Sequence, residues 1–165
     1  MKARIFSGRR KFLPIGLDAA ILSITVLVFA TPVFAALGEE ASSVQNDVAH
    51  MQGSLRTTQS QAFTVHEIAA STGTTVREYA SPSGMIFAVA WQGPWLPNMR
   101  QLLSSYFAQY EQALQASGRD RAGRRPLLIE QPGLVVQSGG HMRSFSGRAY
   151  IPEMMPQGVR AEDIR

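Results

Sequence analysis

The sequence predicts an α+β domain in which a small antiparallel sheet of about five strands carries one long amphipathic helix on one face. Three observations favour this class. Short β-rich runs alternate with Gly, Pro and Ser turns over residues 62–93, apolar residues recur at helical spacing over 98–117, and further β-rich runs follow over 127–152. The helical stretch between the two groups of strands is the element expected to cover the apolar face of the sheet.

Residues 1–35 have the three parts of a cleavable signal peptide. Basic residues come first, an apolar run follows, and small residues precede a cleavage site between Ala35 and Ala36. The apolar run is short for a bilayer span, although an uncleaved membrane helix is the alternative. An arginine pair in the basic region leaves both the general and the twin-arginine export routes open. We expect an exported protein of the periplasm or cell envelope that meets the membrane only transiently, through this segment.

The basic charge of the chain belongs to that N-terminal segment. The sequence holds 16 Lys and Arg against 12 Asp and Glu, and residues 1–35 contain five of the former and one of the latter. Residues 36–165 therefore have no net charge, and we expect no nucleic-acid partner. The chain has no cysteine, which excludes disulfides and thiolate chemistry.

Residues 36–165 are long enough for one domain with its own core. The first part, 36–61, predicts a short helix or extension, because apolar residues recur there at helical spacing. Residues 62–93 then predict a three-stranded antiparallel meander with turns at the Gly- and Pro-containing breaks. Its last run is apolar on both alternating faces, which is typical of a central strand.

Residues 98–117 predict a single continuous helix. Asn98 suits the N-cap and Gln101 the reciprocal position of a capping box. The apolar stripe could line a ligand groove, but so regular a stripe is more typical of core packing. Residues 118–126 are charged and predict an exposed linker.

Residues 127–152 predict a hairpin, and residues 153–165 a tail that wraps the domain edge. The pair at 139–140, both glycines, suits a two-residue turn that makes His141 the first residue of the returning strand. Gly147 predicts a bulge in that strand.

Familiar catalytic patterns are absent from the sequence. His66-Glu67 begins an H-E-x-x-H motif, but the second histidine is missing. His50, His66 and His141 lack the spacing of metal ligands. Glu67 and Glu78 could form a catalytic carboxylate pair, but cross-strand ion pairs with arginine explain them better. We therefore predict no catalytic residue, no metal and no cofactor.

A group of polar side chains on the predicted strands is the candidate ligand-binding set. If these side chains meet on the helix-free face, they form a surface for an anionic ligand. A solvated face held by ion pairs is the simpler interpretation. The set consists of His66, Arg77, His141, Arg143, Arg148 and Tyr150.

Several blocks of the sequence resemble one known family. The blocks are SVQNDVAHMQG, TTVREY, GMIFAVAWQGP, LLSSYF and GLVVQSGGHMRSFSGRAYIP. They are similar to exported bacterial proteins grouped as domain-of-unknown-function family 2844, found chiefly in proteobacteria. The resemblance covers about residues 36–164 and implies an exported architecture without an assigned activity or site residue.

Two functional hypotheses remain. The first is a non-catalytic binding or scaffold module whose partner is another cell-envelope protein, with strand addition at an exposed sheet edge as one binding mode. The alternative is a small periplasmic enzyme or anionic-ligand binder that uses His141 with Arg143 or Arg148.

Overall fold

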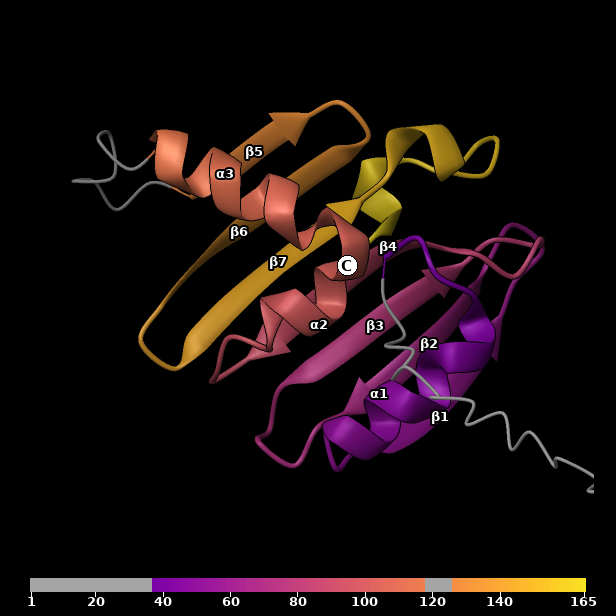
Figure 1. Cartoon of the computed structure of the whole chain (residues 1–165). Helices are drawn as coiled ribbons and strands as arrows, with labels where there is room; N and C mark the ends of the chain where they lie inside the picture. The colour runs from indigo at the N-terminus through magenta and orange to yellow at the C-terminus, as the bar shows by residue number, and fades with distance from the viewer. Residues whose placement is uncertain (1–36, 118–125) are drawn as a thin grey trace, which may run out of the picture. The chain divides into compact units, whose positions relative to one another are not determined.

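A computed structural model describes residues 37–117 and 126–165, which all belong to one compact unit, Pro32–Arg165. Within these residues the chain forms a seven-stranded antiparallel sheet with the strand order β1-β2-β3-β4-β7-β6-β5 (Figure 1). The predicted signal peptide, 1–35, and all but the last residue of the predicted linker lie outside the described residues.

The first half of the sheet is a meander of four strands. They are β1 (Ser54–Gln59), β2 (Thr64–Ala69), β3 (Thr75–Ala80) and β4 (Ile86–Gly93). β1 lies in the segment predicted as a helix or extension. Its polar sequence conceals a strand because all but one of its residues are exposed, so no apolar alternation marks it.

The second half consists of β5 (Leu127–Gln131), β6 (Leu134–His141) and β7 (Ser144–Tyr150). β7 pairs with the central strand β4 and joins the two halves into one sheet. The predicted sheet of about five strands is therefore wrong: β1 and a separate β5 raise the number to seven.

The β6–β7 turn lies beyond the predicted position. His141 pairs with Ser144, so residues 142–143 form the turn and residues 139–140 lie inside β6. A side chain at Gly140 would strike the main chain of Ser144. The glycine is thus needed for a close backbone approach rather than for the turn.

Gly147 does not introduce a bulge, since the register of β7 with both neighbouring strands is unbroken around it. The indole ring of Trp91 instead lies where a side chain at this position would stand. The glycine therefore makes room for the largest buried side chain of the core.

The prediction of one long helix is also wrong. The helical segment divides into α2 (Met99–Leu103), a 3₁₀ turn η2 (Ser104–Tyr106) and α3 (Phe107–Ser117). Ser104 has a φ of 43°, outside the helical range, which interrupts the segment although the apolar stripe continues through it. Asn98 does cap the start of the segment, since its side chain accepts hydrogen bonds from Arg100 N and Gln101 N.

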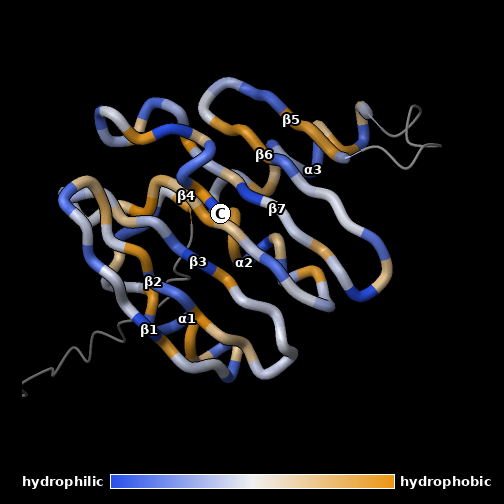
Figure 2. The backbone as a smooth tube through the Cα atoms, turned by 180° about the vertical axis from the view of Figure 1, so that it is seen from behind, coloured by the Kyte–Doolittle hydropathy of each residue, from blue (hydrophilic) through white to orange (hydrophobic). Residues whose placement is uncertain are grey.

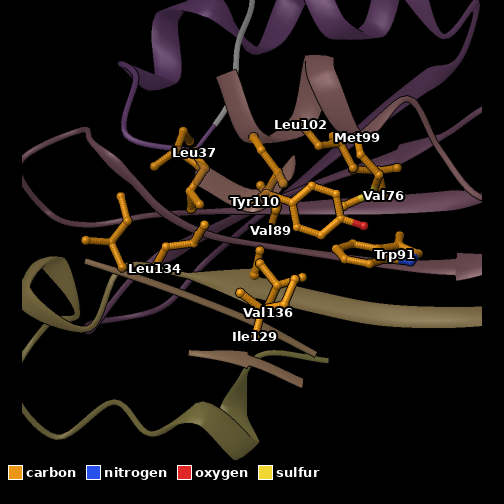
Figure 3. Packing of buried hydrophobic residues seen from close by; sticks show 14 of the residues in the cluster. Leu37, Val76, Val89, Trp91, Met99, Leu102, Tyr110, Ile129, Leu134 and Val136 are labelled. Atoms are coloured by element: carbon orange, nitrogen blue, oxygen red, sulfur yellow. The ribbon is translucent and has the colours of Figure 1, made fainter. Parts of the chain in front are cut away.

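One face of the sheet, here called the helix face, packs against α2, α3 and the short α1 (Val44–His50), which a 3₁₀ turn precedes (Figure 1). Its core contains Trp91 and Leu102 among many apolar side chains (Figure 3). Other labelled members of this cluster are Leu37, Val76, Val89, Met99, Tyr110, Ile129, Leu134 and Val136.

The opposite face, here called the tail face, packs against the C-terminal segment, residues 151–165, from Met154 onward (Figure 2). This C-terminal segment contains two 3₁₀ turns, Pro152–Met154 and Ala161–Asp163. It covers the sheet face rather than wrapping an edge, because Ile164 is buried in an apolar cluster with Phe87. Of the helices in the described ranges, none has the length and apolar character of a membrane span.

Candidate functional site

The structure does not bring the six predicted ligand-binding residues together. His66 belongs to the helix face of β2, while His141 and Arg143 lie at the β6–β7 turn. Arg77 of β3 and the pair Arg148 and Tyr150 of β7 lie on the tail face, where the C-terminal segment covers the sheet.

His66 lies in the register position opposite Glu78 and on the same face of the sheet. Its Nδ1 atom is 3.1 Å from Thr57 Oγ1 on the neighbouring strand. Burial lowers the pKa of the imidazole, so the ring is held in its neutral form. These contacts anchor the side chain to β1 rather than aim it at a ligand.

Arg148 holds the C-terminal segment in place. Its Nε donates to Gln137 Oε1 at 2.8 Å, and its Nη1 donates to the main-chain oxygens of Ala161 and Ile164. Tyr150 is partly buried in the apolar cluster under the same segment. Both side chains therefore contact protein where the sequence hypothesis places a ligand.

The enzyme alternative requires His141 beside a carboxylate or a hydroxyl in a concave pocket. The structure places His141 at the exposed end of β6, beside the turn, with its Nδ1 3.4 Å from Met142 O. Arg143 beside it is exposed and adopts a φ of 61°. Among the described residues, neither a carboxylate nor a hydroxyl bonds to this imidazole, as the enzyme alternative requires.

An open pocket of about 440 Å³ lies on the tail face of β1, β2 and β3. Part of its floor is a row of charged residues that runs across the three strands. Glu67 of β2 lies opposite Arg56 of β1 on one side and opposite Arg77 of β3 on the other. Arg77 Nε donates to Glu67 Oε2 at 2.6 Å, so this carboxylate and this guanidinium neutralise each other.

A second row of the floor consists of Thr58, Val65 and Tyr79, and Phe63 forms an aromatic wall. The ring centroids of Phe63 and Tyr79 are 5.6 Å apart, a usual distance for interacting aromatic rings. Asp163 and Arg165 of the C-terminal segment complete the lining. The pocket thus combines an apolar corner with a charged row.

The Tyr79 hydroxyl bonds to both the main-chain nitrogen and the main-chain oxygen of Arg165. Its hydroxyl donates to Arg165 O at 2.7 Å and accepts from Arg165 N at 2.9 Å, while Arg77 Nη1 donates to the same oxygen at 3.2 Å. Burial raises the pKa of the Tyr79 phenol, which keeps the hydroxyl protonated. The pocket therefore already holds one main-chain unit, that of Arg165.

Arg56 differs from the other arginines of the pocket, since no hydrogen bond or ion pair engages its guanidinium within residues 37–117 and 126–165. The sequence hypothesis did not include it, because the segment was assigned to an extension rather than to a strand. The exposed, polar sequence of β1 carries no alternation that would have found it.

A second unusual feature lies on the helix face and was also misassigned. Glu78, expected to pair with an arginine, is fully buried beneath α1 and α2 beside Asp47, which is fully buried too. Gln101 Nε2 donates to Asp47 Oδ1 at 2.5 Å. Neither oxygen of Glu78 has a hydrogen-bond donor among the described residues.

Burial raises the pKa of Glu78 to about 9, and the nearby Asp47 carboxyl adds to the increase. Burial likewise raises the pKa of Asp47, although the hydrogen bond from Gln101 opposes this effect. Glu78 is therefore protonated at pH 7, so the pair avoids placing two negative charges side by side in the core. Because both carboxyl groups are shut off from solvent, we assign them to the core rather than to a ligand site.

In the described part of the chain, no three His, Asp or Glu side chains gather as metal ligands would.

A family model described as a protein of unknown function, DUF2844, matches residues 33–164. No curated protein and no solved structure shows a significant match to the chain.

Proposed function

The chain belongs to the DUF2844 family, and we propose that it is a non-catalytic binding module of the cell envelope. In this proposal the pocket on the tail face of β1–β3 receives an anionic group of a partner molecule. The observation that carries the proposal is the unengaged guanidinium of Arg56 at the end of a charged row.

The charges of the pocket favour an anion. Three arginines line it, against two acidic side chains. Arg77 neutralises Glu67, and the charge of Arg165 offsets that of Asp163, so one positive charge is left over. What remains for a ligand is the Arg56 guanidinium, which suits a carboxylate through paired N–H donors.

The polar groups of the pocket support binding better than catalysis. Tyr79 is bonded to Arg165 and protonated, and Glu67 is held in an ion pair. A nucleophile or general base must be free to exchange a proton with a substrate, and these groups are already engaged.

Location in the cell envelope rests on the signal-like residues 1–35 and the family resemblance. Mass spectrometry of the protein from a periplasmic extract tests it. A mature chain that begins at Ala36 is the expected result, whereas a cytoplasmic chain retaining Met1 contradicts the proposal.

The binding proposal is tested by titrating the full chain with succinate at low salt, followed through amide shifts in NMR spectra. We expect shifts at Arg56, Glu67 and Tyr79, and an affinity about threefold weaker in Arg56→Gln, the scale of an exposed charge pair. Arg143→Gln is the matched control because it removes another exposed arginine far along the sheet. Equal loss in both variants, or shifts centred on His141, would overturn the assignment to this pocket.

A further inference from the structure

β1 is an edge strand with a regular, unpaired outer side. Its six residues keep an unbroken antiparallel register with β2, and no residue of the described ranges pairs with its other side. Natural edges are often blunted by proline, a bulge or charged side chains, and β1 has no proline and no bulge and a single charged residue, Arg56. Such an edge is a template for another strand.

The outward main-chain groups of β1 follow from the hydrogen-bond alternation. Ser60 N donates to Phe63 O at the start of the hairpin, which makes these residues a hydrogen-bonded pair. Bonded and non-bonded pairs alternate along an antiparallel ladder. The main chains of Arg56 and Thr58 therefore bond to β2, and those of Leu55, Thr57 and Gln59 point outward.

Charge alternates across the strands in the row that ends at Arg56. Arg77, Glu67 and Arg56 occupy successive positions, so the next position outward calls for an acidic side chain. On an added antiparallel strand this position is a non-bonded pair with Arg56, the same relation in which Glu67 meets Arg77 at 2.6 Å.

The neighbouring row specifies a second side chain. Thr58 and Val65 lead from the edge to the apolar corner formed by Phe63. On an antiparallel strand the residue opposite Thr58 precedes the residue opposite Arg56 by two positions. The added strand should therefore carry an apolar residue opposite Thr58, then any residue, and then an acidic residue opposite Arg56.

We propose that β1 binds an extended acidic peptide of a partner protein as an additional antiparallel strand, with its acidic side chain against Arg56. This inference rests on the proposed function and names the partner chemistry for the same site. A second copy of the chain fits less well, because Arg56 is the only charged residue in β1 and would find no acid on an identical strand.

The test uses the full chain and the capped peptide Thr-Val-Thr-Glu-Thr-Thr, with amide hydrogen exchange and shift titration as the readouts. We expect new protection at Leu55, Thr57 and Gln59 but little change at Arg56 and Thr58, whose amides already bond to β2. Replacing glutamate by glutamine in the peptide weakens binding about threefold, and Arg56→Gln then abolishes the difference between the two peptides.

Thr57→Pro removes an outward N–H from the edge without removing a bond to β2, and we expect it to weaken peptide binding about tenfold. Thr57→Val is the matched control, since it also loses the hydroxyl contact with His66 but keeps the N–H. Equal affinity of these two variants, or peptide binding without protection of the alternate amides, overturns strand addition.

The outcomes separate the two proposals. If succinate binds at Arg56 but the peptide protects no amide of β1, strand addition fails and the anion pocket stands. If Arg56→Gln changes the affinity for neither succinate nor the peptide, both proposals fail. Protection that appears without peptide and grows with protein concentration shows a second copy on the edge and also overturns the acidic partner.

Discussion

The two faces of β3 treat neighbouring charged residues in opposite ways. Glu78 is fully buried on the helix face without any cation, whereas Arg77 on the tail face is partly exposed and bonded to Glu67 at 2.6 Å. Burial beside another acid keeps Glu78 protonated, whereas Arg77 and Glu67 meet as an ion pair at a partly exposed surface. One strand therefore carries a neutral carboxyl for packing and a charged row for binding.

The difference comes from what covers each face. α1 and α2 close over the helix face, where Asp47 of α1 lies beside Glu78 and Gln101 of α2 donates to Asp47. The C-terminal segment covers only part of the tail face and leaves the pocket open beside β1. Complete burial forces neutralisation, whereas a partial cover preserves charges that a partner can bind.

The largest expected effect is on the pH dependence of stability, through Glu78→Gln. The pKa of Glu78 is raised from 4.5 to about 9 in the folded chain, so the folded state holds a proton that the unfolded state has lost. Its contribution is fully present below pH 4.5 and declines as pH rises toward 9, by up to ~1.4 kcal/mol per pH unit. The amide cannot ionise and lacks this decline.

Urea unfolding at pH 5, 7 and 8.5, followed by tryptophan fluorescence, gives the free energy of unfolding at each pH. The slope of this free energy against pH is then compared between wild type and variant. Glu67→Gln is the control, because it removes an ionised acid from the tail face of the neighbouring strand and should keep the wild-type slope at alkaline pH. Parallel curves for wild type and Glu78→Gln would show that Glu78 is ionised in the folded state.

An intermediate effect is expected for Arg148→Gln, which tests how firmly the tail face holds its cover. The change removes donors to the main-chain oxygens of Ala161 and Ile164, and hydrogen bonds from charged groups typically contribute about 2 kcal/mol. The free energy of unfolding should fall by that amount, and amide exchange should accelerate in residues 151–165. Arg143→Gln, in the exposed turn, should change neither quantity. An unaltered exchange pattern would show that apolar contacts alone hold the segment.

The smallest effect on stability is expected for Glu67→Gln. Its ion pair with Arg77 is about a third exposed, so the loss should stay below ~1 kcal/mol. The same change frees the Arg77 guanidinium, and succinate should bind about threefold more tightly at low salt. A large stability loss with unchanged succinate affinity would mean that the row is structural and does not attract anions.

Much of the strand content was predictable because one buried face imposes alternation. The runs that became β2, β3 and β4 carry such patterns, and β4, apolar on both faces, is buried on both. β1 lacked the pattern because it is an exposed edge. The break at Ser104 was hidden for the opposite reason, since the apolar stripe runs through it and only the backbone departs from the helix.

The candidate site was predictable only in part. Arg77 was named, and its strand neighbour Glu67 was correctly expected to form a cross-strand ion pair with arginine. Glu78 was expected to do the same, yet its position two residues from Val76 already places it on the apolar side of β3. His141 and Arg143 were grouped with residues from which the long β6–β7 hairpin separates them.

Local chemistry in the chain specifies local features: the cap at Asn98, the strands with a buried alternation, and the family, whose model spans residues 33–164. Which charged groups meet depends on pairings between segments far apart in the chain, and on which segments cover each face. Arg77, for example, is linked through Ala90 of β4 to Arg148 of β7 in one row of the sheet. Solvent access and partner distance set the charge state of a side chain, and both arise only when the helices and the C-terminal segment have closed over the sheet.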